Sequence, residues 1–327
     1  MQRRFKTLAL TLAFSTMLTT AAQAVELKIA TIAPQGTTLY SELESAAQEI
    51  ATKTGGKVTF KIFGGAVLGE DKEIVGKMRY GELDGAALTG VGLGIIEPEI
   101  RALELPFLFE NTTQVDKVYE ALSPHFSQKF SQKGFELLGW SEIGFIKIFS
   151  NKPIRTKADL KGMKMWMWEG DLLAKTMFEE LNVTPIPLSI ADVLPSLQTS
   201  VIDVVYGPET GAIAFQWQTA VKYMTDINLT NGTGGIVLTS KAWNKISAAD
   251  RTLVKEIMSR HAKLLTEKTR SENQASKQAL QNSGVQFVNI DAKGVEELKT
   301  IGKTVRQKLI GQLYSQDVLD KIQAAIQ

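Results

Sequence analysis

Apolar and polar segments alternate along the first part of the chain and predict a repeated order of strand and helix. VELKIATIA at 25–33 has the β-branched residues and alternation typical of a strand, and the segment at 39–56 has the periodicity of an amphipathic helix. The order restarts with a strand at 57–63, a loop and helix at 64–84, and an apolar strand and turn at 85–94. This order favours a mostly parallel sheet covered by helices.

The carboxyl ends of these strands are where a ligand site is expected. Open sheets of this kind bind their ligands beyond the carboxyl ends of their strands. Pro34 follows the first strand and Thr89 ends the third, so we expect both residues to line a site.

A second series of strands and helices begins near residue 134 and predicts a second α/β lobe. It contains a strand region at 134–154, a turn and strand ending in KMWMWEG at 164–170, and a helix at 171–181. A helix followed by a strand at 190–208 then repeats the order of the first series.

A long polar helix is predicted from Ser247 to about Asn282, with Ser247 as its N-cap and Asp250 at position N3. At 1.5 Å per residue it would be about 50 Å long, enough to brace two lobes. We assign residues 25–144 with about 233–272 to lobe I, and residues 145–232 with about 273–327 to lobe II. The pattern therefore predicts a two-lobed α/β fold with a hinged cleft, which is suited to trapping a small molecule.

The N-terminus has the pattern of a cleavable secretory signal peptide. Arg3, Arg4 and Lys6 precede a short apolar stretch, and residues 1–24 end in AAQA. Cleavage would leave a chain exported to the periplasm. It would also change the formal net charge from +2 to −1, which gives no basis for nucleic-acid binding. The chain has no cysteine, which excludes disulfides, thiolate metal sites and cysteine nucleophiles.

Several ordered motifs resemble the DctP-like substrate-binding proteins of tripartite ATP-independent periplasmic (TRAP) transporters. They are EIATKTGGKVTFKIFGGAVLGEDKEIVGKMRYGELDGAAL, PEIRALELPFLFEN, SNKPIRTKADLKGMKM and PIPLSIADVLPSLQTSVIDVVYGP, and together they span nearly all of the chain after residue 24. The resemblance implies a receptor with two α/β lobes that delivers its ligand to a small and a large integral membrane subunit. It also implies that ion gradients supply the energy for transport.

The sequence departs from this family at three positions where carboxylate-binding members usually carry a polar group. Trp166 replaces the arginine of the family's G-L-K-I-R-V segment. Ile146 replaces a basic residue that often comes before the S-N-x-P-I turn, and Gly207 replaces an amide residue that often comes directly before a proline. An arginine is the natural partner of a carboxylate because its planar fork donates two parallel hydrogen bonds. We therefore expect a ligand that is not held by the usual arginine–carboxylate salt bridge.

An apolar or aromatic ligand would suit the residues that replace these anchors. Trp166 and Trp168 lie two apart on a strand and share one face, away from the neighbouring methionines. The other candidate site residues lie near strand ends of the cleft or beside these tryptophans, namely Trp140, Tyr206, Phe107 and Glu169. A cationic ligand is a second possibility, because aromatic faces attract ammonium groups and Glu142, Glu169 or Asp171 could supply countercharge. The alternative functions are a C4-dicarboxylate-like binder with a non-standard anchor, or an exported ligand sensor.

Catalysis and metal binding have no support in the sequence. The chain contains no G-x-S-x-G, H-E-x-x-H, calcium-loop or phosphate-loop pattern. His125 and His261 are far apart, and GVGLG at 90–94 lacks the third glycine of the dinucleotide pattern. We therefore expect a monomeric receptor without catalytic residues, metal or cofactor.

Overall fold

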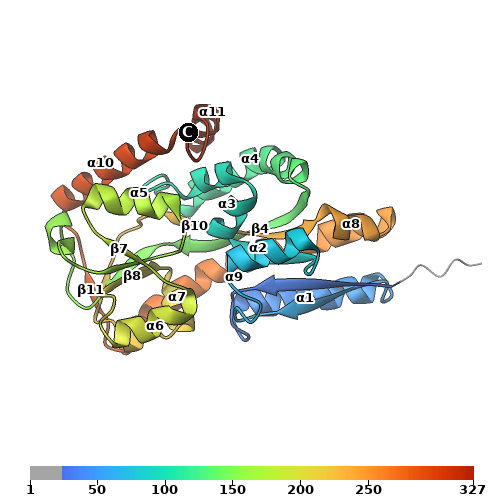
Figure 1. Ribbon diagram of the computed structural model, residues 1–327, viewed down its shortest axis with the longest axis horizontal. Coiled ribbons are helices and arrows are strands. Elements are labelled where there is room, and N and C mark those ends of the chain that lie inside the picture. Colours follow the sequence, from blue (N-terminus) through green and yellow to red (C-terminus); the bar gives the residue numbers. More distant parts are fainter. Residues whose placement is uncertain (1–23) are drawn as a thin grey trace, which may run out of the picture.

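The computed structural model describes residues 24–327, whose strands form two β-sheets (Figure 1). The predicted signal peptide lies outside the described residues except for Ala24. None of the helices formed by residues 24–327 is long and apolar enough to cross a membrane.

The strands are, in chain order, β1 (Val25–Thr31), β2 (Val58–Phe63), β3 (Gly85–Thr89), β4 (Phe135–Phe145), β5 (Lys147–Ser150), β6 (Met165–Met167), β7 (Pro185–Pro187), β8 (Val204–Gly207), β9 (Tyr223–Thr225), β10 (Asn231–Thr239) and β11 (Gln286–Val288). The first sheet has the order β2-β1-β3-β10-β4 and forms the core of lobe I. The second has the order β11-β9-β5-β8-β6-β7 and forms the core of lobe II.

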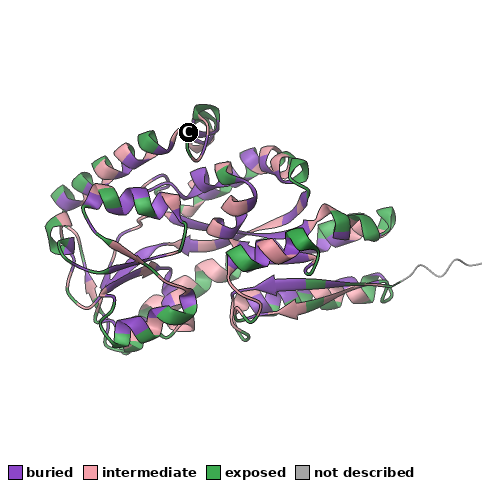
Figure 2. Cartoon of the chain, in the orientation of Figure 1, coloured by how far each residue is buried: buried purple, intermediate pink, exposed green. Residues whose placement is uncertain are grey.

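The α-helices are α1 (Thr38–Lys53), α2 (Asp71–Tyr80), α3 (Gly90–Ile96), α4 (Thr112–Gln132), α5 (Leu172–Leu181), α6 (Ile190–Gln198), α7 (Glu209–Ala214), α8 (Ser240–Lys245), α9 (Ala248–Asn282), α10 (Ala292–Leu309) and α11 (Gln316–Ile326). Three short 3₁₀ helices are η1 (Pro98–Glu104), η2 (Lys157–Leu160) and η3 (Trp217–Thr219). Figure 2 shows buried residues along the strands and exposed residues on the outward faces of helices such as α2 and α10.

Both sheets are mixed rather than mostly parallel. In the first sheet β1 runs parallel to β2 and β3, but β10 runs antiparallel to both β3 and β4. In the second sheet β5 runs antiparallel to β8 and β9. The difference from the sequence pattern arises because β5 and β10 are the strands by which the chain enters one lobe from the other.

The chain crosses between the lobes at three places. β4 and β5 are separated by Ile146 alone, and residues 226–230 connect β9 to β10. The third crossing is α9, which packs against β4 and α1 in lobe I and against α7 in lobe II. Ser247 caps α9 by accepting a hydrogen bond from Asp250 N, which confirms the predicted start of the long helix.

The last two helices also contact both lobes. α10 packs against α5 of lobe II, whereas α11 packs against α4 and η1 of lobe I (Figure 1). The sequence pattern assigned all of residues 273–327 to lobe II, and α11 departs from that assignment. Its apolar face, with Val318, Leu319 and Ile322 buried, covers lobe I instead.

The side chain of Asn273 on α9 makes hydrogen bonds to α7 of lobe II and to β4 of lobe I. Its Oδ1 accepts hydrogen bonds from Thr210 N at 3.1 Å and from Thr210 Oγ1 at 2.8 Å, and its Nδ2 donates to Ile143 O at 3.1 Å.

Asn273→Ala should lower the free energy of unfolding by about 1–2 kcal/mol. Each lost hydrogen bond is worth about 1 kcal/mol, and the higher helix propensity of alanine offsets part of the loss. Thermal unfolding measures the change. Gln274→Ala, at an exposed position of the same helix, is the control, and equal melting temperatures for both variants would contradict this role.

Candidate functional site

A cavity of about 650 Å³ lies between the two lobes. This volume is within the range of roughly 300–1,000 Å³ that is common for small-molecule sites. Its walls come from the strand ends of lobe I, from β6, α5 and β8 of lobe II, from the crossings, and from α9. The lining residues used below are Pro34, Thr89, Arg101, Glu104, Glu142, Ile146, Trp166, Trp168, Asp171, Phe178, Tyr206, Gly207 and Trp217.

Aromatic side chains form the lobe II wall of the cavity. The ring centroid of Trp166 lies 4.9 Å from that of Trp168, 5.1 Å from that of Tyr206 and 5.7 Å from that of Trp217. Phe178 meets Tyr206 edge to face at 5.8 Å. Trp166 is 1% exposed, and its indole N–H donates to Leu188 O at 3.0 Å, which satisfies the one polar atom of a buried ring.

Gly207 and Trp217 occupy the same part of this wall. A Cβ at position 207 would lie 2.9 Å from Cζ3 of Trp217, closer than real Cβ atoms approach a ring. The indole therefore fills the space that a side chain at position 207 would need. The two residues together explain why no polar amide can stand before Pro208 in this chain.

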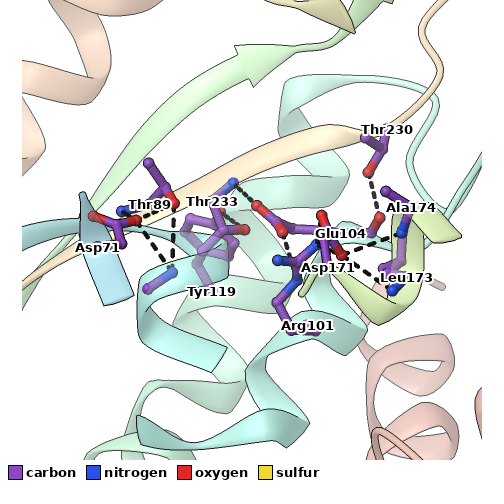
Figure 3. Close-up of polar contacts among 11 residues, drawn as sticks. Asp71, Thr89, Arg101, Glu104, Tyr119, Asp171, Leu173, Ala174, Thr230 and Thr233 are labelled. Carbon is purple, nitrogen blue, oxygen red and sulfur yellow. Dashed lines mark hydrogen bonds and ion pairs between the residues drawn. The ribbon is translucent and has the colours of Figure 1, made fainter. Parts of the chain in front are cut away.

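A buried charged cluster also lines the cavity, beside Tyr206 of the aromatic wall (Figure 3). Nη2 of Arg101, from η1 in lobe I, lies 3.1 Å from both carboxylate oxygens of Asp171, the N-cap residue of α5 in lobe II. Nε of the same guanidinium lies 2.9 Å from Oε2 of Glu104. All three residues are at most 7% exposed. The cluster therefore links the two lobes through one arginine and two carboxylates.

Backbone N–H groups hold the two carboxylates of this cluster in place. Oδ1 of Asp171 accepts hydrogen bonds from Leu173 N and Ala174 N at the start of α5, and Oε1 of Glu104 accepts one from Thr233 N at 2.7 Å. Burial raises the pKa of the Glu104 carboxyl above its usual value, against the lowering effects of Arg101 and of the Thr233 hydrogen bond. For Arg101, burial lowers the pKa and its two carboxylate neighbours raise it, with a net value above the usual range.

A third buried carboxylate, that of Asp71, supports the lobe I side of the cavity. Oδ2 of Asp71 accepts hydrogen bonds from Thr89 Oγ1, from Thr89 N at 3.1 Å and from Gly92 N at 3.2 Å (Figure 3). These bonds fix Thr89, which lines the cavity, and tie the N-terminus of α2 to that of α3. Burial raises the pKa of Asp71 to about 6, although these hydrogen bonds lower it.

Seven of the ten residues expected at the site line the cavity, and three do not. Trp140 packs against Tyr119 and Phe126 and donates its N–H to Ser123 Oγ at 2.6 Å, so it belongs to the packing of α4 on the first sheet. Phe107 has a positive φ of 53° and lies against Gly302 of α10. Glu169 is exposed and pairs with Lys72 at 3.1 Å.

Arg101, Glu104, Phe178 and Trp217 line the cavity although the sequence pattern did not single them out. Arg101 and Glu104 carry opposite charges three residues apart within the otherwise apolar run IRALELPF. Such a pair inside an apolar run is the signal that could have marked them, since charged residues are seldom fully buried unless they are paired. No comparable signal distinguishes Trp217 or Phe178.

Known proteins resemble this chain in sequence and in fold. The family model for bacterial extracellular solute-binding proteins of family 7 (DctP) matches residues 29–312. The C4-dicarboxylate-binding periplasmic protein DctP of Vibrio cholerae is 27% identical over 292 residues, which cover 85% of this chain and 83% of that protein.

Two crystal structures of TRAP periplasmic solute-binding proteins show the same fold. One, from Pseudomonas putida F1 with bound D-glucuronate, has a TM-score of 0.85 at 24% identity and covers 92% of this chain and 97% of its own. The other, from Ralstonia eutropha H16 with bound (S)-2-acetolactate, has a TM-score of 0.86 at 22% identity and covers 92% and 98%. At these identities the likeness shows the fold alone.

Asp71 makes the stability of lobe I depend on pH. Because its folded-state pKa of about 6 lies above the reference value of 3.8, its stabilising contribution is complete below about pH 3.8 and is lost as the pH rises through 6. The loss is on the order of 3 kcal/mol by pH 8. Asp71→Asn cannot ionise, so its melting temperature relative to wild type should rise between pH 4 and pH 8. A difference in melting temperature that stays constant over this range would contradict the assignment.

Proposed function

Because the chain belongs to the DctP family of TRAP solute-binding proteins, family 7 of the bacterial extracellular solute-binding proteins, we propose that its solute is an organic acid with an apolar or aromatic body. The acid group would bind at Arg101 and the body would lie against the aromatic wall of lobe II. The observation that carries this proposal is the presence of one guanidinium in a cavity whose lining is mostly apolar and includes an aromatic wall.

The known relatives favour an acid over an uncharged ligand. The proteins named above bind a C4-dicarboxylate, D-glucuronate and acetolactate, all of which carry a carboxylate. The expectation of a purely apolar ligand finds no support among them. The alternative expectation, a carboxylate held by a non-standard anchor, is therefore the one we propose.

Arg101 is the anchor that this cavity offers. It is the one cationic side chain among the described lining residues. Its Nη2 and Nε face Asp171 and Glu104, while its Nη1 makes no hydrogen bond to any residue from 24 to 327. An incoming carboxylate can accept a charge-assisted hydrogen bond from Nη1 without breaking the contact between the lobes.

The lobe II wall favours a flat or aliphatic body over a fully hydroxylated one. Trp168 and Tyr206 are partly exposed and offer ring surface at the cavity, whereas Trp166 and Phe178 are 1% and 2% exposed and pack against them. Ile146 stands at the crossing where the family resemblance implies a polar group. A ligand rich in hydroxyl groups would leave many of them without partners there, and each such buried group costs about 1–3 kcal/mol. A larger apolar body gains free energy from the same surface.

A cationic ligand is a second candidate because of one specific observation. The cluster holds two carboxylates for one guanidinium and therefore carries excess negative charge next to aromatic rings. An ammonium group would be attracted to both. The two candidates differ in the sign of the ligand's charge, which binding experiments separate directly.

We further propose that the receptor works in the periplasm and delivers its solute to the small and large membrane subunits of a TRAP transporter. This rests on family membership and on the periplasmic location given for the Vibrio cholerae relative. An exported sensor would use the same cavity. Solute uptake by cells that carry this chain and both membrane subunits, lost when the chain is deleted, distinguishes transport from sensing.

Three probes of the same shape test the charge of the ligand. In isothermal titration calorimetry we expect 3-phenylpropanoate to bind and 3-phenylpropylammonium to show no binding. We expect 3-phenylpropanamide to bind at least about tenfold more weakly than the acid, because it loses a charge-assisted hydrogen bond worth about 1.5–3 kcal/mol. Succinate, which lacks the apolar body, is the control for the aromatic wall. Equal affinity for acid and amide would refute the anchor, and preferential binding of the ammonium would establish the cationic alternative.

Trp168 tests the contribution of the aromatic wall without altering the charged cluster. Trp168→Ala should weaken binding of 3-phenylpropanoate about tenfold, since an aromatic contact contributes about 0.5–1.5 kcal/mol beyond the area it buries. Trp168→Phe should retain most of the affinity. Trp243→Phe, on α8 and outside the cavity lining, is the matched control. Unchanged affinity in Trp168→Ala would show that the body of the ligand lies elsewhere.

A further inference from the structure

The charged cluster that lines the cavity has one positive and two negative groups before any ligand binds. Arg101 already faces Asp171 and Glu104, so the carboxylate of a bound acid becomes the third anionic group around one guanidinium. Three carboxylates that share one arginine in a desolvated site repel one another strongly, because burial weakens the screening that water provides. The charge must be balanced by some other group.

We propose that Glu104 takes up a proton from solvent when a carboxylate ligand binds at Arg101, so that the receptor binds the organic acid together with a proton. This inference rests on the proposed function. In the bound state the ligand is an anion, Asp171 and Arg101 remain an ion pair, and Glu104 is a neutral carboxylic acid. The proton leaves a hydronium ion or a buffer acid in the solvent, which becomes its conjugate base, and the O–H bond of Glu104 forms; no other covalent bond changes.

Arg101 is the one basic side chain among the groups that act on Glu104. The groups that face it are Arg101 on η1, Asp171 at the start of α5, Tyr206 on β8, Tyr119 on α4 and the Thr233 N–H on β10. Burial raises the pKa values of both tyrosines well above their usual value, so neither gains or loses a proton near neutral pH. Glu104 and Asp171 are therefore the two groups able to accept the proton.

Asp171 accepts more hydrogen bonds than Glu104 does. It caps α5, where two backbone N–H groups donate to its Oδ1 and the helix dipole favours a negative charge. It also holds Nη2 of Arg101 with both oxygens. Protonation of Asp171 would weaken all of these contacts and the link between the lobes.

Protonation of Glu104 breaks fewer hydrogen bonds than protonation of Asp171 would. Oε1 can still accept the hydrogen bond from Thr233 N, and the proton can reside on Oε2. The Nε of Arg101 lies 2.9 Å from Oε2 but makes no directed hydrogen bond to it. Oε2–H is then a donor for the carboxylate of the ligand. The raised pKa of the Glu104 carboxyl, which burial causes, supports this choice.

Gly90 keeps Glu104 in this position. A Cβ at residue 90 would lie 2.2 Å from Oε1 of Glu104, so only glycine allows the carboxyl to approach the start of α3 this closely. The carboxyl therefore occupies the space that a side chain at residue 90 would fill, so a larger residue at this position would displace it.

Proton uptake can be counted by calorimetry of the whole protein. 3-Phenylpropanoate is titrated at pH 8 in phosphate and in Tris, two buffers with different ionisation enthalpies, and the difference in observed enthalpy gives the number of protons. We expect about one proton per bound acid, and an affinity that falls about tenfold for each further unit of pH. The uncharged 3-phenylpropanamide should take up none.

Glu104→Gln separates this role from a structural one. The variant has no carboxyl at this position, so its binding of the acid should take up no proton and should not change with pH. Glu209→Gln, at a buried carboxyl with a raised pKa outside the cavity lining, is the matched control and should still show uptake. If Glu104→Gln does not fold, the contrast between acid and amide in the wild type remains the test.

The outcomes distinguish this inference from the proposed function. Acid binding without proton uptake in the wild type, or uptake that persists in Glu104→Gln, would overturn the role of Glu104 and leave the proposed function standing. Loss of uptake in Glu142→Gln alone would likewise assign the proton to another lining carboxyl and overturn the role. Failure of the acid to bind, or equal binding of acid and amide, would refute the proposed function itself.

Discussion

The contact between Arg101 and Asp171 joins the two lobes at the cavity, and the properties of the site depend on it. Removing a guanidinium and a carboxylate from water costs several kcal/mol for each ion, and the attraction between the ions and the hydrogen bonds to them must offset that cost. Here the N-terminus of α5 stabilises Asp171, and Glu104 provides a second carboxylate for Arg101. The pair links η1 of lobe I to α5 of lobe II, so it forms only when the lobes are close together.

The aromatic wall of lobe II is related to the position of Arg101 in lobe I. At the position on β6 where the family resemblance implies an arginine, this chain carries Trp166, and under the proposed function the arginine is supplied by lobe I. Trp217 then packs beside it over Gly207, and Tyr206 stacks on it at 5.1 Å. The replacements at 166 and 207 are therefore parts of one packing arrangement rather than separate losses of polar groups.

The sequence predicted the fold well and the site in part. Periodicity and the Ser247 cap identified the long helix, and the position of Trp166 and Trp168 in a family motif led to the cavity wall. Arg101 was missed because its partner Asp171 is 70 residues away in the other lobe, and no local pattern reports such a contact. Trp140 and Phe107 were assigned to the cavity by their nearness to strand ends, but the face on which α4 packs and a positive φ direct them elsewhere.

Moving the arginine from one lobe to the other changes how a ligand and closure of the lobes are related. An anchor on lobe II that meets only the ligand binds it independently of the lobe I contacts. In the proposed mode of binding, Arg101 would meet both the ligand and Asp171, so an anionic group at Nη1 would lie next to the ion pair that joins the lobes. The ligand would then act on closure through charge as well as through the surface it covers. Such a site would respond to the net charge of its occupant, with the protonation state of Glu104 setting which charge it accepts.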